Sequence, residues 1–434
     1  MQENQPVIWP VWRKITFRFF FIYFLLFTSP WTWLDSVPGV SFVTQYWYSA
    51  ETWIVQLFNK YLLHVKENVA PVFNGSGDTS YSWAQLFTHL LLALTGCMIW
   101  SIIDYKRNHY KITDFWLRNI VRYYVSLVAF LYGIIKLFAL QMPFPNLSQL
   151  ATPLGDYLPM RLSWMFVGYS APYQMFSGLM EVMVGILLLN RKTITLGSLM
   201  GIGVFANVAM LNLSYDIPVK IYSIQLFISC IFLAVHDWRR IANFFVLNKA
   251  TETDSSYELI LTKKWQRVAR IIAKATFVIL FVAMPFYNSW SRYDNLRKQS
   301  DLKPIKSGVY DIKTFVRNHD TIPPLITDTL HWKDIIFEKG GLGSVNSTDT
   351  LFRQRYRRGY FYYQPDTLTR TIAIKYTPSD TAALFTMKYD IPDENRIHLW
   401  TVVRGDSLYL ELVRSKRHFQ LAERQFHWLS EANR

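Results

Sequence analysis

Long apolar runs separated by short basic segments dominate the first 290 residues of this chain. A helix needs about 20 mainly apolar residues to cross a bilayer, so each of these runs is a candidate span. Seven spans are predicted, at about residues 15–34, 86–103, 123–140, 173–189, 194–213, 219–235 and 271–287. Hydrophobic residues make up 51% of the chain, and their concentration in these runs predicts a membrane protein with an all-α bundle.

Two further stretches of this region are predicted to lie outside the spans. Residues 40–66 are apolar but are interrupted by Glu51 and Lys60, among other charges. Apolar side chains recur there at helical spacing, which favours an amphipathic helix at the membrane surface over a span. Residues 141–170 form a proline-containing loop, in which a short surface helix is expected around residues 158–167.

The basic segments predict how the chain is oriented. Lysine and arginine gather at Arg13 and Lys14, in residues 106–122, at Arg191 and Lys192, at Arg239 and Arg240, and in residues 263–274. Seven spans place all of these segments on one side, which the positive-inside rule assigns to the cytoplasm. The N-terminus is then inside, and everything after the seventh span is outside.

The pattern changes after Trp290, where a charged linker at residues 291–306 leads into short alternating segments. Examples of the alternation are residues 372–376, 385–389 and 408–412, and Gly405-Asp406 is a hairpin turn signal between two such runs. Seven or eight strands at this spacing predict an antiparallel meander that closes into a small lipocalin-like barrel. Two alternatives stay open, a β-module with a filled apolar core and a hollow cup for an apolar ligand.

Arginines and aromatic residues alternate within residues 353–363 of this region. This strip could bind anionic headgroups or a partner, and it could equally be the solvated face of a strand.

Charge and composition exclude several other classes of function. The net charge of +15 would suggest nucleic-acid binding in a soluble protein, but the basic residues flank apolar runs and need no nucleic acid to explain them. Cys97 and Cys230 lie inside predicted spans without a CxxC pair, so they are expected to be inert thiols. His236 is expected to be an ordinary boundary histidine, and no metal site is predicted.

Ionisable residues inside the predicted spans are the strongest candidates for a functional site, because a charge at membrane depth is costly. Glu181 lies ten residues before Arg191, about 15 Å from the inner boundary, and Lys136 lies fourteen residues after Arg122, about 21 Å from it. A lysine side chain can cover the offset of about 6 Å, so an ion pair is predicted. Asn207 is predicted at a similar height.

Two interpretations of this pair stay open, a buried ion pair that only fixes helix register, and a polar pocket open to the outside. Such a pocket would bind a lipid headgroup or a quinone ring, or relay protons. Tyr132, one turn before Lys136, is a candidate phenolic donor or a packing residue. At the outer mouth, Asn212 stands with Asp216 and Lys220, whose i,i+4 spacing is also typical of a solvated pair.

These residues resemble a known family. Tyr132-Gly-Ile-Ile-Lys136 on one span, with Gly178-Leu-Met-Glu181 and Gly185-Ile-Leu-Leu-Leu189 on the next, are similar to the helices of DoxX-like membrane proteins. Residues 212–220 and 426–431 resemble segments of larger DoxX-like proteins that carry an outer β-domain. The resemblance implies a four-helix core and a link to quinone-coupled sulfur oxidation or to membrane redox complexes.

The sequence as a whole predicts five segments: N-terminal spans and an interfacial helix (1–120), a DoxX-like bundle (121–240), a connector and seventh span (241–290), a linker (291–306) and an outer β-domain (307–434). The expected location is a bacterial-type cytoplasmic membrane, with the β-domain on the periplasmic side. The expected function is a module associated with quinone or lipid, or a subunit of a membrane redox complex. The alternatives are an envelope protein that binds or transfers lipid through its β-domain, with an envelope partner subunit, and a scaffold.

Overall fold

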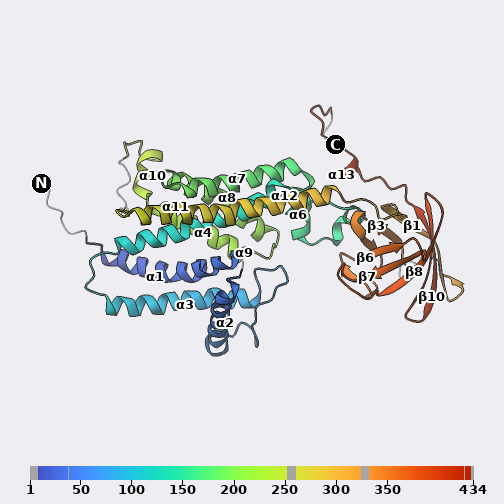
Figure 1. Ribbon diagram of the computed structural model, residues 1–434, viewed down its shortest axis with the longest axis horizontal. Helices are drawn as coiled ribbons and strands as arrows, with labels where there is room; N and C mark the ends of the chain where they lie inside the picture. Colours follow the sequence, from blue (N-terminus) through green and yellow to red (C-terminus); the bar gives the residue numbers. More distant parts are fainter. Residues whose placement is uncertain (1–7, 38, 252–260, 324–331, 425, 432–434) are drawn as a thin grey trace. The chain divides into compact units, whose positions relative to one another are not determined.

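The computed structural model describes residues 8–37, 39–251, 261–323, 332–424 and 426–431. The chain divides into two compact units (Figure 1). A helical unit contains residues 1–142 and 170–291, and a barrel unit contains residues 143–169 and 292–434.

The helical unit is built from the apolar runs of the sequence. Its helices are α1 (Val11–Thr28), α3 (Ser80–Ile103), α4 (Lys111–Leu137), α7 (Ala171–Leu189), α8 (Ile194–Ser214), α9 (Lys220–Val235), α10 (Trp238–Phe245) and α11 (Lys264–Val278), which continues through the π turn η5 (Ile279–Ala283) into α12 (Met284–Arg297). Among the described residues, six helices or continuous helical runs are long and apolar enough to cross a membrane. A seventh is added if α9 and α10, which are bent by 80° at their junction, count as one span.

Helix α2 (Ser41–Phe58) and the π turn η2 (Asn59–Leu63) occupy the stretch predicted to be an interfacial helix. Figure 1 shows α2 crosswise to α1 and α3. Its outer face leaves Tyr46 and Trp53 exposed, while its inner face buries Glu51 beside His89 of α3, with 2.9 Å between Glu51 Oε1 and His89 Nε2. Exposed aromatic rings are typical of a helix at a membrane surface, and the interfacial position of α2 stays a prediction.

Helix α4 is central to the helical unit, where it packs against α1, α7, α9 and η5. Its approach to α7 is close because two glycines face each other. A Cβ added to Gly178 would lie 2.6 Å from the carbonyl oxygen of Gly133, and one added to Gly133 would lie 2.9 Å from that of Gly178. Small residues at this crossing therefore let the two backbones touch, as in membrane helix pairs.

The barrel unit contains β1 (Gly308–Arg317), β2 (Asp320–Thr321), β3 (Asp334–Phe337), β4 (Leu342–Val345), β5 (Arg353–Arg355), β6 (Arg358–Asp366), β7 (Thr371–Lys375), β8 (Phe385–Asp393), β9 (Arg396–Val403) and β10 (Asp406–Arg414). Eight of these strands form a closed antiparallel ring, because β10 pairs with β1, while β2 and β5 are short additions. The register places Leu410 opposite Leu399 in β9 and opposite Phe315 in β1. The predicted antiparallel barrel is confirmed, and so is the turn at Gly405, whose φ is +90°.

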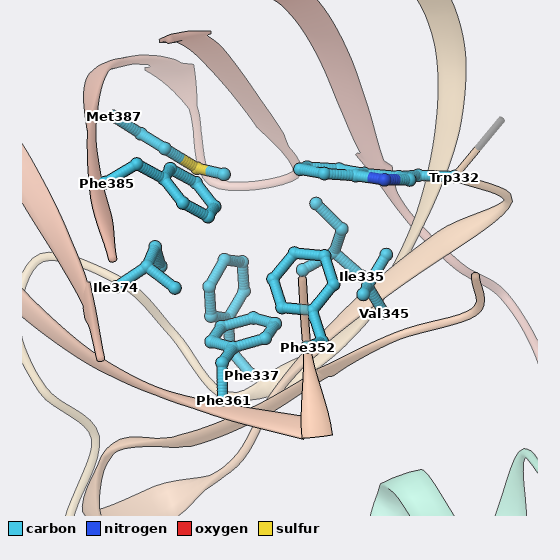
Figure 2. A pocket seen from close by; sticks show the side chains of 9 residues that line it. All are labelled: Trp332, Ile335, Phe337, Val345, Phe352, Phe361, Ile374, Phe385 and Met387. Atoms are coloured by element: carbon cyan, nitrogen blue, oxygen red, sulfur yellow. The ribbon is translucent and has the colours of Figure 1, made fainter. Parts of the chain in front are cut away.

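The interior of the described barrel is filled with side chains. Figure 2 shows rings and aliphatic groups that converge from different strands and from the segments just before β3 and β5, namely Trp332, Ile335, Phe337, Val345, Phe352, Phe361, Ile374, Phe385 and Met387. The cavity between them has a volume of only about 10 Å³. That space holds one water molecule at most, so of the two alternatives the structure has the filled core and not the hollow cup.

The loop between α4 and α7 belongs to the barrel unit. It contains α5 (Leu147–Leu150), the 3₁₀ turn η3 (Leu154–Asp156) and α6 (Pro159–Tyr169), which confirms the short helix expected around residues 158–167. The segment predicted as a bundle, residues 121–240, contains this loop between its spans, but contacts far along the chain group the loop with the strands. The chain therefore passes between the two units three times, at residues 142–143, 169–170 and 291–292.

Candidate functional site

The two facing sides of α4 and α7 carry a row of polar and small residues. The structure brings Lys136 and Glu181 together in this seam, where Lys136 Nζ donates a hydrogen bond to Glu181 Oε1. The two residues are only 7% and 2% exposed. Helical spacing explains the row, because Gly133 and Lys136 on α4 share a face, as do Gly178 and Glu181 on α7.

Two hydrogen-bonded contacts hold the seam on either side of the pair. Toward one end, Ser126 Oγ donates to the carbonyl oxygen of Gly185, at 2.9 Å. Toward the other end, the fully buried Gln174 accepts from the backbone N–H of Met142 at 3.0 Å and donates to its carbonyl oxygen at 2.7 Å. Gln174 was missed by the sequence analysis, although it lies seven residues before Glu181 and thus on the same face of α7.

The hydrogen-bonding capacity of the ion pair is only partly used. Glu181 Oε2 is buried and has no hydrogen-bond partner among the described residues. The Lys136 ammonium carries three N–H donors, and the bond to Glu181 Oε1 is the one hydrogen bond recorded for it in the described part of the chain. The pair can therefore donate to a carbonyl oxygen and accept from a hydroxyl at the same position, and a buried carboxylate beside an ammonium can also pass a proton.

Two further residues were predicted at the height of the pair, and their side chains are exposed. Tyr132 is 40% exposed, and its ring lies 6.5 Å from the ring of Tyr222. Asn207 is exposed on α8, on the face opposite the buried Phe205 and Ala209, and within the described residues it has no recorded hydrogen bond. Neither residue has a recorded hydrogen bond to the Lys136–Glu181 pair within the described part of the chain, but Tyr132 is close enough for the charge of Glu181 to act on it.

The three outer-mouth residues lie at the α8–α9 connection. Lys220 Nζ lies 2.7 Å from Asp216 Oδ1, and Asn212 Nδ2 donates to the carbonyl oxygen of Val219 at 3.4 Å. A residue that sequence reasoning missed completes this cluster. The Asp78 carboxylate accepts from the backbone N–H groups of Lys220 and Ile221, at 2.8 and 3.1 Å, and so caps the first turn of α9. The cluster therefore holds the loop before α3 against the α8–α9 connection.

A further polar cluster gathers residues of the opposite, basic end of the helical unit. Asp114 accepts from His236 at 3.1 Å and lies 3.3 Å from Arg118 Nε, while His236 Nδ1 lies 2.9 Å from the carbonyl oxygen of Phe232. Both ring nitrogens of His236 therefore have a polar neighbour in the protein. The described residues contain no group of three or more histidine, cysteine or acidic side chains that could hold a metal ion.

The barrel unit contains its own buried polar network. Arg358 is 2% exposed and donates to Asp334 Oδ1 at 2.6 Å and to Ser344 Oγ at 3.1 Å. Ser344 Oγ in turn donates to Ser148 Oγ at 2.8 Å, and Ser148 donates through both its N–H and its hydroxyl to Glu338 Oε1. This network ties the α4–α7 loop to strands almost 200 residues further along the chain.

The arginine strip of residues 353–363 divides between two environments. Arg353 and Arg355 are exposed on β5, as expected for a solvated strand face, whereas Arg358 is buried in the network just described. Burial also raises the pKa of the neighbouring Tyr360 to about 12, because the charged phenolate is poorly solvated there. The strip is therefore not one continuous basic surface.

Comparisons with known proteins give little further guidance. No family model matches the chain, and no solved structure matches it. The chain is similar to the uncharacterized protein YwoB of Bacillus subtilis (strain 168), with 32% identity over 84 residues. The matched region is 19% of this chain and 54% of YwoB, so the chain spans about half the length of that relative.

Proposed function

We propose that this chain is a multi-pass membrane protein of DoxX-like type whose α4–α7 seam holds the polar end of a quinone or a lipid. The unused acceptor at Glu181 Oε2, beside a lysine with spare donors, carries this proposal. A quinone carbonyl would accept from Lys136, and the hydroxyl of the reduced ring or of a lipid headgroup would donate to Glu181 Oε2. A buried oxygen left without a partner is costly, which favours such a ligand.

The proposed orientation follows from the two ends of the helical unit. The N-terminal part of α1 and the junctions α3–α4, α7–α8 and α9–α10 carry the lysines and arginines, which the positive-inside rule assigns to the cytoplasm. The segments that connect to the barrel unit are joined to the C-terminal end of α4, the N-terminal end of α7 and the C-terminal end of α12, which are not the basic ends. The barrel is then on the periplasmic side of a bacterial-type membrane, where a partner subunit of a redox or envelope complex would reach it.

Mass spectrometry of ligands that co-purify with the protein in mild detergent tests the proposed site. Lys136→Ala and Glu181→Ala should each lower the amount of bound quinone or lipid by tenfold or more, in protein that remains folded. Lys298→Ala removes the exposed ion pair with Asp294 and is the matched control, for which ligand retention should not change. Unchanged retention in folded Lys136→Ala and Glu181→Ala would refute the site.

A scaffold is the second candidate function, and it is favoured by the filled barrel. A cavity of about 10 Å³ has no room for an acyl chain, so the barrel interior does not favour lipid transfer through the β-domain. The glycine contact between α4 and α7 also makes the seam compact. If partner capture depends on the barrel while ligand content is zero in the wild-type protein, the scaffold becomes the better account.

A further inference from the structure

Arg122 on α4 is a buried cation without a counter-ion in the described protein. The residue is 7% exposed, and its Nε is enclosed without a hydrogen-bond partner. No carboxylate of the described residues lies within ion-pair distance of it. Its recorded contacts are both with Tyr123: a side-chain hydrogen bond, and a cation–π contact in which the ring centroid lies 4.8 Å from Arg122 Cζ. A cation–π contact offsets only part of the cost of burying a guanidinium group.

The neighbouring charges make this position more positive. Arg118 and Arg191 are the ionisable cations that act on Arg122, and both repel it. The nearby carboxylate of Asp114 is already shared by Arg118 and His236, at 3.3 and 3.1 Å. One turn deeper, the hydroxyl of Ser126 is committed to the carbonyl oxygen of Gly185. Among the described residues, two like charges therefore act on Arg122, and no carboxylate lies within ion-pair distance of it.

The depth of Arg122 limits which anion can reach it. Helix α4 has 27 residues and is about 40 Å long, which exceeds the bilayer hydrocarbon core by about 10 Å. Arg122 is eleven residues from the basic end of the helix, and its guanidinium can extend back toward Arg118 and the headgroup layer. Phosphate groups are the anions at that depth, and arginine binds them through paired hydrogen bonds.

We propose that Arg122, with Arg118 beside it, forms a binding site for a phosphate group at the basic end of the α4–α7 seam. The phosphate would belong to an anionic phospholipid of the cytoplasmic leaflet, and a free phosphate ion is the other source of the same chemistry. The proposal rests on membrane insertion and on the orientation given above, and it is independent of the Lys136–Glu181 site.

The test uses the full-length protein in neutral detergent, titrated separately with phosphatidylglycerol, phosphatidylcholine and inorganic phosphate. Lipid retention is counted by native mass spectrometry, and the thermal midpoint is followed in parallel. Wild-type protein should retain phosphatidylglycerol and gain several degrees in thermal midpoint, while phosphatidylcholine has little effect. Stabilisation by inorganic phosphate alone, without lipid retention, would identify a free-ion site and overturn the lipid assignment.

Variants at this position distinguish binding from folding. Arg122→Gln should lose phosphatidylglycerol retention at least tenfold, yet be as stable as wild type without lipid, because it removes an uncompensated buried charge. Arg122→Lys keeps the charge and should retain part of the binding. Arg239→Gln, at an exposed arginine 5.7 Å from the Trp238 ring, is the matched control and should behave as wild type. Equal lipid retention by Arg122→Gln and wild type would overturn the proposal.

Discussion

The buried pair of Arg358 and Asp334 gives a quantitative test of how the barrel unit is held together. Asp334→Asn keeps the shape of the side chain but removes its charge, and the guanidinium of Arg358, at 2% exposure, then lacks a counter-ion. Removing one partner of a buried ion pair typically costs about 3–5 kcal/mol. In a unit of this size, each kcal/mol lost from the free energy of unfolding lowers the thermal midpoint by about 2–4 °C. We therefore expect the midpoint of Asp334→Asn to decrease by about 10 °C.

A double variant separates the charge effect from a packing effect. Replacing both partners by apolar residues, Asp334→Leu with Arg358→Met, removes the uncompensated charge and should recover most of the lost stability. Ser344 keeps its hydrogen bond to Ser148 in that variant. Thermal unfolding of the full-length protein, followed by differential scanning calorimetry, measures each midpoint. The reasoning is refuted if Asp334→Asn shifts the midpoint by less than about 2 °C, or if the double variant is less stable than Asp334→Asn.

Three further predictions follow from single contacts. Gly178→Ala places a methyl group against the backbone of α4 and should destabilise the helical unit by about 1–3 kcal/mol. Gly203→Ala is the control and should be neutral, because no atom lies within 4 Å of its added Cβ. Unfolding in denaturant measures the stability of both variants. Because the pKa of Tyr360 is raised, its contribution to stability is complete below pH 10 and is lost as the pH rises from about 10 to 12. An alkaline unfolding titration of wild type and Tyr360→Phe checks this. Identical curves for the two proteins would contradict it. Asp78→Ala removes the cap of α9 and should cost about 1 kcal/mol and increase proteolysis of the loop before α3, whereas Asp216→Ala, at a side chain 81% exposed, should leave the cleavage rate unchanged.

The elements that the sequence predicts well are those with a strong periodic signal. Each predicted span corresponds to a helix, because a run of about 20 apolar residues has few other stable environments. The strands were predictable from alternation, as at Leu408, Leu410 and Leu412, whose side chains all point into the barrel core. The α4–α7 loop had no such signal. Its link to the barrel depends on Ser148, whose partner Glu338 is 190 residues away.

The sequence predicts the depth of each site residue along its helix, but not which face of the helix it lies on. Helix rise placed Lys136 and Glu181 within reach of each other, and the structure joins them. The same arithmetic placed Asn207 at that height, but a residue two positions after the buried Phe205 lies about 200° around the helix and therefore faces outward. The sequence predicts Arg122 at the inner boundary of its span. Its burial is caused by neighbouring helices, which no local pattern in the sequence reveals.

The most direct test of the account is quinone binding by a variant in which both members of the pair are apolar. Lys136→Met with Glu181→Leu removes the charges without leaving an unpaired one, so the bundle should fold with wild-type stability or better. Titration of the protein in lipid nanodiscs with a short-chain quinone measures the site alone. The account predicts a folded double variant that binds at least tenfold more weakly than wild type. Binding at wild-type strength by the folded variant would contradict it.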